Sequence, residues 1–544
     1  MTDRRTVVRA LNRLAWAYTV LGENDHRIRA YSRAAESLDG ITQDFAEAHK
    51  NGRLAATPGV GAACMEVVEA VMAGATPDVL ANVESRIPAS LFDLRYVSGL
   101  GPKRIRTLWS GLAITNLLEL ATACEESRLL ALPGFGAKLQ DRIALGVQKA
   151  LHNRTYRRLD HATSAAADLL SIDPKAVIVG DLRRGCEVIM TVDAVSPDAR
   201  PYGVQTTVHG FTAWQFEVAG VPVRWIKAEP TVVTCWWLTG SDAHRDAVVA
   251  HARRRGLRLT ETGLFKRRQA IAITSEDELY ETLQLIPVAP EQREGSTLQV
   301  TRPQHRLIQR SDLKGALHNH TVASDGSATL EQMRAAAAER GLSYLGISDH
   351  SPTAHYANGL VQKRLVDQRS AIRALPDGPC TLLTGVESDI LPSGLPDHAM
   401  PLLKTLDVVI GSIHDRARQD NETLTARLIR ATQWAHIIGH PTGRLLLGRA
   451  ASDIDMEALI AACAKTGCIL ELNANPQRLD LNATHAAMAK EAGVLVSIAA
   501  DAHSVADLDN LDYGVTIARR AGLSADDVLN TRPLSELLVT LRAL

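Results

Sequence analysis

The carboxy-terminal part of the chain, residues 311–544, alternates short apolar runs with helical segments, and this alternation restricts the fold more than any other feature. Runs such as YLGIS (344–348), VVIGS (408–412) and VSIAA (496–500) are mostly apolar and partly β-branched, as in strands buried on both faces. Residues 327–341 and 455–467 have helical spacing. Strands that alternate with helices predict a parallel α/β barrel or a close relative of one.

Histidines and carboxylates stand where these apolar runs end, and ten of the 18 histidines lie in residues 311–544. The carboxyl ends of barrel strands open on one face, so residues far apart in sequence can converge there. In His318-x-His320 and Asp501-x-His503, the period of two points both side chains to the same side of an extended segment. The candidate metal ligands are His318, His320, Asp325, His350, Glu387, His414, His440, Asp501 and His503.

A ligand set of imidazoles and carboxylates without cysteine suits zinc, manganese or iron and does not have the character of a soft thiolate site. Because nine ligands are too many for one ion, we expect two or three divalent ions, Mn²⁺, Zn²⁺ or Fe²⁺. Any single histidine could instead be a hydrogen-bonded core or loop residue. That interpretation explains the whole set poorly, because six of the ten histidines end strands or stand in alternating pairs.

The motifs HNHTVASDG, SDH, GVESDI, GSIH, GHPTGR and DAH make residues 314–544 resemble the PHP (polymerase and histidinol phosphatase) domain, a distorted (β/α)7 barrel. The resemblance implies a trinuclear cluster with a metal-bound hydroxide and no separate protein base. The first ion would be held by His318, His320, Glu387 and Asp501. Glu387 would bridge to a second ion held by His414 and His440. The third would be held by Asp325, His350 and His503.

Three Gly-apolar-Gly turns, each followed by an amphipathic helix, indicate helix-hairpin-helix elements in the first 150 residues. Such turns aim main-chain N–H groups at phosphates, which predicts DNA binding without sequence preference. A single turn of this kind would more often be structural only, and the first copy could still be so. The predicted DNA-binding residues are Gly59, Gly61, Gly99, Gly101, Lys103, Gly134, Gly136 and Lys138.

Residues 1 to about 290 resemble the bacterial family X DNA polymerases in GENDHRIRAYSRAAESL, the hairpins, VGDLRRG, the long segment around 238–265 and SEDELYETL. The resemblance implies an all-α region at 1–150 (8-kDa-like and fingers-like) and an α+β palm and thumb at 151–290. Residues 291–313, which include Pro, Gly and Ser with little periodicity, read as a linker to the barrel at 314–544.

The polymerase carboxylates that this family needs are incomplete. Asp193 matches the second Asp of the family's Asp-x-Asp pair, but Thr191 stands at the first, and Pro222 stands at the third carboxylate. One Asp cannot hold two Mg²⁺ ions, so we expect a folded palm without polymerase activity, in which Asp193 is a relic. If the family alignment is shifted here, other carboxylates could serve; the candidates are Glu187, Asp198 and Glu217.

A second chemistry of some relatives is also not expected. A deoxyribose-phosphate lyase needs a lysine amine for its Schiff base. The family resemblance assigns this lysine to the helix after the first hairpin, at the position of Val67.

The net charge of −1 conceals a basic part, residues 1–310, and an acidic part, residues 311–544. Seven scattered cysteines without a CxxC pair favour reduced thiols, and no apolar run approaches the ~20 residues that cross a bilayer. The amino terminus lacks the pattern of a secretory signal, so we expect a cytoplasmic monomer with DNA as its partner and no membrane contact.

The predicted function is metal-dependent phosphoester hydrolysis on DNA, as a 3′-5′ exonuclease or 3′-end-processing enzyme in DNA repair. Three alternatives stay open: an active repair polymerase with a PHP nuclease, a small-molecule phosphatase of the histidinol phosphate type, and a non-enzymatic DNA scaffold.

Overall fold

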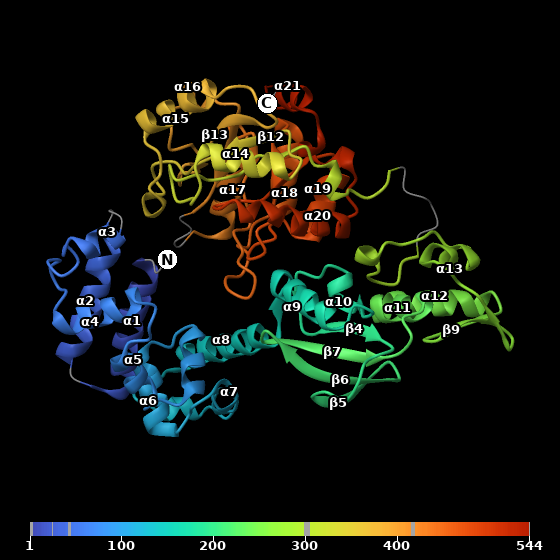
Figure 1. Cartoon of the computed structure of the whole chain (residues 1–544), viewed down its shortest axis with the longest axis horizontal. Helices are drawn as coiled ribbons and strands as arrows, with labels where there is room; N and C mark the ends of the chain where they lie inside the picture. Colours follow the sequence, from blue (N-terminus) through green and yellow to red (C-terminus); the bar gives the residue numbers. More distant parts are fainter. Residues whose placement is uncertain (1–3, 24, 42–44, 299–304, 415–418, 543–544) are drawn as a thin grey trace. The chain divides into compact units, whose positions relative to one another are not determined.

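The computed structural model of the chain describes residues 4–23, 25–41, 45–298, 305–414 and 419–542 (Figure 1). It divides into two compact units, Met1–Thr155 and Tyr156–Leu544, which we describe separately. The middle of the predicted linker, residues 299–304, lies outside the described residues.

The first unit is helical, and its helices bury one continuous apolar core. Leu11, Leu14, Val67, Leu91 and Leu108 are fully buried in this core. The helices are α1 (Arg4–Leu21), α2 (Asp25–Asp39), α3 (Phe45–Lys50), α4 (Ala62–Met72), α5 (Asp78–Glu84), η1 (Ala89–Tyr96), α6 (Pro102–Leu112), α7 (Leu117–Glu125), η2 (Arg128–Ala131) and α8 (Ala137–Thr155).

Each of the three predicted hairpin turns leads directly into a helix, α4, α6 or α8. The first glycine of each turn, Gly59, Gly99 or Gly134, has a φ between 81° and 91°, a conformation that glycine adopts without strain. The second glycines, Gly61, Gly101 and Gly136, directly precede these helices, and a Cβ at any of them would meet open space. The main-chain N–H groups at the helix starts are therefore accessible, and Lys103 and Lys138 beside them are exposed.

The second unit begins with a palm-like α+β segment. Its five-stranded sheet has the order β2-β4-β7-β6-β5, in which β4 and β7 are parallel and the other pairs are antiparallel. The elements are β1 (Arg157–Arg158), α9 (Leu159–Ile172), β2 (Val177–Val179), α10 (Gly180–Arg183), β3 (Val188–Ile189), β4 (Val192–Ser196), β5 (Val204–Val208), β6 (Phe211–Val218) and β7 (Val221–Lys227).

A small thumb-like segment follows, with its own core around the fully buried Trp236, Val248 and Tyr280. A three-stranded antiparallel meander packs beside its helices (Figure 1). The elements are α11 (Val232–Thr239), α12 (Asp242–Arg254), β8 (Leu257–Thr260), β9 (Gly263–Lys266), β10 (Gln269–Ile271), α13 (Glu276–Thr282) and η3 (Pro290–Gln292).

Seven parallel strands, paired in sequence order, form the carboxy-terminal barrel. They are β11 (Gly315–Ala316), β12 (Tyr344–Ile347), β13 (Thr381–Asp389), β14 (Val408–Ser412), β15 (Ile437–Ile438), β16 (Ile469–Asn473) and β17 (Val496–Ala499). The buried Asn530 bridges β11 and β17, because its amide donates to Gly315 O and Ile498 O and accepts from the Ile498 N–H. The barrel is therefore nearly closed, and the predicted fold class is confirmed.

Helices surround these strands (Figure 1). At the end where the strands begin, Leu537 and Leu541 of the last helix pack with Tyr344, Val408 and Ile437. The helices are η4 (Arg310–Asp312), α14 (Leu330–Glu339), η5 (His355–Ala357), α15 (Gln362–Ala374), α16 (Met400–Leu403), α17 (Asn421–Ala431), α18 (Met456–Thr466), α19 (Ala483–Glu491), η6 (Ala506–Asn510), α20 (Leu511–Arg520), η7 (Ala525–Asp527), η8 (Leu529–Thr531) and α21 (Leu534–Arg542).

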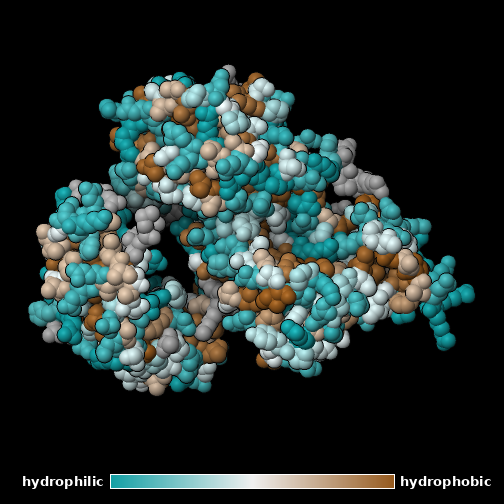
Figure 2. Space-filling view, in the orientation of Figure 1, coloured by the Kyte–Doolittle hydropathy of each residue, from teal (hydrophilic) through white to brown (hydrophobic). Residues whose placement is uncertain are grey.

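The barrel surface is predominantly hydrophilic on the face that Figure 2 shows, with apolar side chains scattered among polar ones. Among the described helices, none combines the length and the apolar content that crossing a bilayer requires.

Candidate metal centre

All nine predicted ligands lie at one end of the barrel, where its strands finish. His318 and His320 follow β11, His350 follows β12, and Glu387 lies near the end of β13. The other strands continue the series, with His414 two residues beyond β14, His440 two residues beyond β15, and Asp501 and His503 just after β17. Asp325 reaches the same place from the loop before α14. The parallel topology thus brings together side chains from six strand ends.

Glu387 is the common neighbour of this group. Its Oε1 lies 3.0 Å from Nε2 of His440, 3.3 Å from Nε2 of His414 and 3.4 Å from Nε2 of His318. Its Oε2 lies 2.8 Å from Nδ1 of His350 and 3.8 Å from Nε2 of His320. The carboxylate is 1% exposed, so these imidazoles and any bound cation replace water as its partners.

The ligand atoms fall into three sets, within each of which they lie less than 4.8 Å apart. They are His318, His320 and Glu387; His350, Glu387 and His414; and His320, Asp325, His350 and His503. Asp501 joins the first set, since its Oδ1 lies 3.3 Å from Nε2 of His320. The grouping that the family resemblance implies differs in two respects. His320 and His350 are each shared between two sets. His440 belongs to none of the three, although its Nε2 lies 3.0 Å from Oε1 of Glu387.

Exposure increases across the centre. His318, His320 and His440 are at most 2% exposed, whereas the side chains of Asp325 and His503 are 22% and 35% exposed. A substrate can therefore reach the centre from the side of Asp325 and His503.

Several buried ligand atoms have no hydrogen bond to any described residue, which is the state expected of atoms that bind an ion. They are Nε2 of His318, both ring nitrogens of His320, Nδ1 of His350 and Oε2 of Glu387; the last two lie 2.8 Å apart, but not in the geometry of a hydrogen bond. Leaving such atoms without partners in a protein interior is costly unless a ligand satisfies them. The donor set and its burial therefore fit divalent metal ions.

The carboxyls of the centre are held ionised. Burial opposes the charge of Glu387, but His414, His318 and His350 outweigh it, so the pKa of Glu387 lies well below its ordinary value. Burial opposes the charge of Asp501 as well, and His318, His320 and His503 hold its pKa well below the ordinary value. Burial lowers the pKa of His440 to about 3, so this imidazole is neutral and can bind a metal through a ring nitrogen.

Two of the nine residues have a backbone conformation that side chains rarely adopt. His440 has φ = 26° and Asp501 has φ = 50°. Each costs about 1–2 kcal/mol relative to ordinary φ values. Strain of this kind is typical of functional sites, where the rest of the fold enforces it.

Two carboxylates that support the ligands are absent from the sequence prediction. Glu471 of β16 lies 2.6 Å from Nδ1 of His318, and Asp389 of β13 lies 3.2 Å from Nδ1 of His414. Such contacts fix which ring nitrogen faces a metal. The sequence carries a signal for both carboxylates. Glu471 interrupts the apolar run ILELN. Asp389 follows Glu387 by two residues in the same strand, so both side chains point to the same side.

Charged residues just beyond the strands differ in what they contact. Arg444 donates to both oxygens of Glu187, at 2.9 Å each, and Lys363 pairs with Asp367 at 3.1 Å. Arg478 points to the centre, with Nε 3.6 Å from Oδ2 of Asp501. Of these three, Arg478 is therefore the cation placed to meet a substrate phosphate.

The palm places its remaining polymerase-type carboxylate against an arginine. Asp193 of β4 accepts from Nε and Nη2 of Arg224 of β7 at 2.6 Å each. Burial raises the pKa of Asp193, although Arg224 opposes this. Pro222 lies two residues before Arg224 in the same strand.

The three alternative palm carboxylates lie in separate places. Glu187 binds Arg444, Asp198 pairs with Lys175 at 2.9 Å, and Glu217 of β6 is exposed opposite Pro222. β6 is separated from β4 by β7, so Glu217 lies two strands from Asp193.

Comparison with known proteins matches four parts of the chain to family models. Residues 3–76 match a helix-hairpin-helix domain, 92–149 a SAM-like helix-hairpin-helix tandem, 234–294 the DNA polymerase beta thumb and 316–475 the PHP domain.

Curated relatives match either the whole chain or a part of it. The DNA polymerase/3′-5′ exonuclease PolX of Bacillus subtilis (strain 168) is 30% identical over 567 aligned residues, which cover 98% of both chains. A probable phosphatase of Pectobacterium carotovorum subsp. carotovorum (strain PC1) is 29% identical over 235 residues, 40% of this chain and 89% of the relative. A probable phosphatase of Thermoanaerobacter sp. (strain X514) is 29% identical over 229 residues, which cover 39% of this chain and 89% of the relative.

Proposed function

This chain belongs to the family X DNA polymerases that carry a carboxy-terminal PHP domain, and we propose that it hydrolyses phosphodiester bonds at the 3′ ends of DNA without polymerising. Hydrolysis would take place at the barrel, the hairpins of the first unit would hold the DNA backbone, and the palm would catalyse no nucleotide addition.

The observation that carries this proposal is the convergence of nine imidazoles and carboxylates at one end of the barrel: seven form the three ligand sets, and His440 and Asp501 adjoin them through Glu387 and His320. We assign two or three divalent ions, Mn²⁺, Zn²⁺ or Fe²⁺, to the three ligand sets described above. When bound, such ions supply Lewis acidity to a phosphate ester and lower the pKa of water. Glu387 and Asp501 contribute the negative charge that retains them.

The surrounding residues orient the substrate. The more exposed side, at Asp325 and His503, leaves room for a DNA terminus, and Arg478 can pair with a phosphate oxygen there. Accessible N–H groups at the starts of α4, α6 and α8 contact phosphates without reading bases. Together they favour a substrate with a long phosphate backbone over a small phosphate ester.

Loss of polymerase activity is the second part of the proposal. Two Mg²⁺ ions need several carboxylates, whereas Thr191 and Pro222 stand where the family has two of them. The remaining Asp193 is already bonded to Arg224 through both oxygens.

Hydrolysis of a phosphomonoester at a DNA 3′ end is a second candidate. The Pectobacterium and Thermoanaerobacter relatives, which match the PHP part of the chain, are named as probable phosphatases. The same ligand set can act on either ester, since in both the attacked atom is phosphorus.

The test uses the full-length protein after chelation and reloading with Mn²⁺ or Zn²⁺. Three substrates are compared: a 5′-labelled oligonucleotide with a 3′-hydroxyl, the same oligonucleotide with a 3′-phosphate, and histidinol phosphate. We expect stepwise shortening of the first and no turnover of the third. Preferred turnover of histidinol phosphate would reject DNA as the substrate.

The paired variants are Glu387→Gln at the centre and Glu457→Gln on the exposed surface of α18. Glu387→Gln should abolish hydrolysis while DNA affinity, measured by fluorescence anisotropy, stays unchanged. Normal cleavage by Glu387→Gln would overturn the assignment of the site.

A further inference from the structure

A cavity lies at the opposite end of the barrel from the metal centre. Its volume is about 1000 Å³, large enough for a nucleotide-sized ligand. Its lining includes residues that directly precede strands, such as Asp407 before β14 and His436 before β15, whereas the candidate metal ligands His414 and His440 follow these strands. Five residues of β14 alone span ~16 Å, so the cavity is separate from the centre described above.

The cavity is strongly cationic. Arg369, Arg373, Lys404 and Lys465 line it, against a single carboxylate among the described lining residues, Asp407. Oδ2 of Asp407 already accepts from the N–H and hydroxyl of Thr384, at 2.9 and 2.7 Å. The ligand that balances this charge is an anion.

The cations differ in mobility. Arg369 donates to the hydroxyl of Thr405 and Arg373 to its carbonyl at 3.1 Å, so both guanidinium groups are held beside the cavity. Lys404 and Lys465 are exposed, and no described carboxylate forms an ion pair with either. Two fixed guanidinium groups together with two movable ammonium groups suit a ligand with more than one phosphate.

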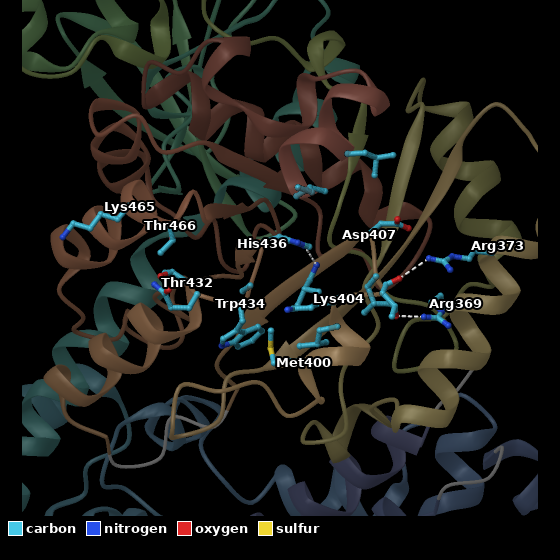
Figure 3. Close-up of a pocket in the computed structure, with 18 residues that line it drawn as sticks. Arg369, Arg373, Met400, Lys404, Asp407, Thr432, Trp434, His436, Lys465 and Thr466 are labelled. Carbon is cyan, nitrogen blue, oxygen red and sulfur yellow. Dashed lines mark hydrogen bonds between the residues drawn. The ribbon is translucent and has the colours of Figure 1, made fainter. Parts of the chain in front are cut away.

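The middle of the cavity is apolar. Figure 3 shows Trp434 and Met400 between the two arginines at one end and Lys465 at the other. Nε1 of Trp434 donates to Gly394 O at 2.9 Å, which fixes the indole and leaves its ring as apolar lining. A flat aromatic group between charged ends matches this surface.

A directional donor completes the lining. Nδ1 of His436 accepts the Val409 N–H at 3.0 Å, so in the neutral ring Nε2 carries the proton. Burial lowers the pKa of His436 to about 4, which keeps the ring neutral near pH 7. Its N–H is therefore a fixed donor for a base or sugar oxygen.

We propose that this cavity binds a nucleotide, with its phosphates on Arg369, Arg373 and the lysines and its base beside Trp434 and Met400. The nucleotide is either free or part of a single strand, since both present the same chemistry. The site would give the barrel a ligand-binding role independent of hydrolysis.

The test uses the full-length protein in chelator, which removes metal-dependent binding elsewhere. Titration calorimetry compares ATP, a short thymidylate oligonucleotide and inorganic phosphate. The double variant Arg373→Glu/Lys465→Glu is compared with Lys314→Glu, an exposed lysine just before β11 that does not line the cavity. Thermal melting confirms that each variant is folded.

We expect the double variant to weaken ATP or oligonucleotide binding about ten-fold or more, and Lys314→Glu to leave it unchanged. If the double variant weakens binding of ATP alone, the ligand is a free nucleotide; if it weakens binding of the oligonucleotide alone, beyond what the hairpins bind, the ligand is a strand. The proposal is overturned if neither nucleotide ligand binds, if the double variant binds like wild type, or if inorganic phosphate binds as tightly as ATP.

Discussion

Glu471 lies 2.6 Å from Nδ1 of His318, and its other oxygen accepts the main-chain N–H of His440, also at 2.6 Å. One fully buried carboxylate therefore orients two candidate ligands from different strand ends. Burial works against the protonation of His318, but Glu471, Glu387 and Asp501 outweigh it and raise its pKa well above the ordinary value. In the metal-bound protein this negative charge would instead strengthen His318 as a ligand.

Glu471→Gln should lower metal affinity about 10–100-fold, because the amide removes the charge and offers an N–H where the carboxylate accepts one. Metal retention against increasing chelator concentration measures this effect, and DNA affinity should not change. Glu457→Gln is the matched control, since Glu457 is exposed on α18. Equal retention by both variants would show that Glu471 does not support the ligands.

The absence of polymerisation is tested most sharply when the nuclease is inactive. In the Glu387→Gln background the primer is protected from hydrolysis, and we expect no extension of a primed template with Mg²⁺ or Mn²⁺. Arg224→Ala should not create extension, because freeing Asp193 still leaves one carboxylate. Template-directed incorporation that Asp193→Asn abolishes would refute the loss of activity.

The sequence was sufficient for the barrel and for the gathering of the nine side chains, because parallel strands force their ends to one face. It was not sufficient for Glu471, whose partner His318 lies 153 residues earlier in the chain. The interrupted apolar run marks Glu471 as unusual, but its role depends on a contact that only the fold creates.

The same limit applies to Arg444, which follows the candidate ligand His440 by four residues. Its guanidinium is occupied by Glu187, 257 residues earlier, and by main-chain oxygens of residues 478 and 479. Short-range patterns report strand ends and turns well, whereas they carry no information about which distant partner a long side chain finds.

Low pH should lower the folding stability of the thumb-like segment, because His244 becomes protonated. This histidine is 1% exposed and contacts the Tyr280 hydroxyl at 2.8 Å, and burial, with help from Arg293, lowers its pKa to about 4. In the unfolded chain His244 is protonated below about pH 6.5, whereas in the folded protein it stays neutral down to about pH 4. Its contribution to stability is therefore fully present above pH 6.5 and is lost as the pH falls toward 4. Between pH 7 and 5 the loss is about 2 kcal/mol.

Hydrogen exchange of α12, corrected for intrinsic rates, measures this loss. His244→Phe should show a smaller difference between pH 7 and 5, because it has no group to protonate. His161→Phe, at a half-exposed position of α9, should behave like wild type. An unchanged pH dependence in His244→Phe would assign the effect to another group.

The ion pair between Glu187 and Arg444 should couple the palm to hydrolysis. Arg444 donates at 2.9 Å to each oxygen of Glu187 and to the carbonyl of Arg478, whose own side chain lies 3.6 Å from Asp501. A second palm contact supports the coupling, since Arg520 of α20 donates to the Arg184 carbonyl at 2.7 Å. The palm therefore holds the loop that carries Arg478 even though it has no polymerase chemistry of its own.

Glu187→Gln should lower kcat/KM for oligonucleotide hydrolysis by about ten-fold, the factor expected when a charge-assisted bond worth ~1.5 kcal/mol is lost. The matched control is Glu217→Gln, which removes an exposed palm carboxylate. Because Arg478 is placed to meet substrate phosphate, the loss should fall mainly on KM, whereas general destabilisation would lower kcat through the fraction of folded enzyme. A variant with unchanged KM would show that the palm contact stabilises the fold without positioning the substrate.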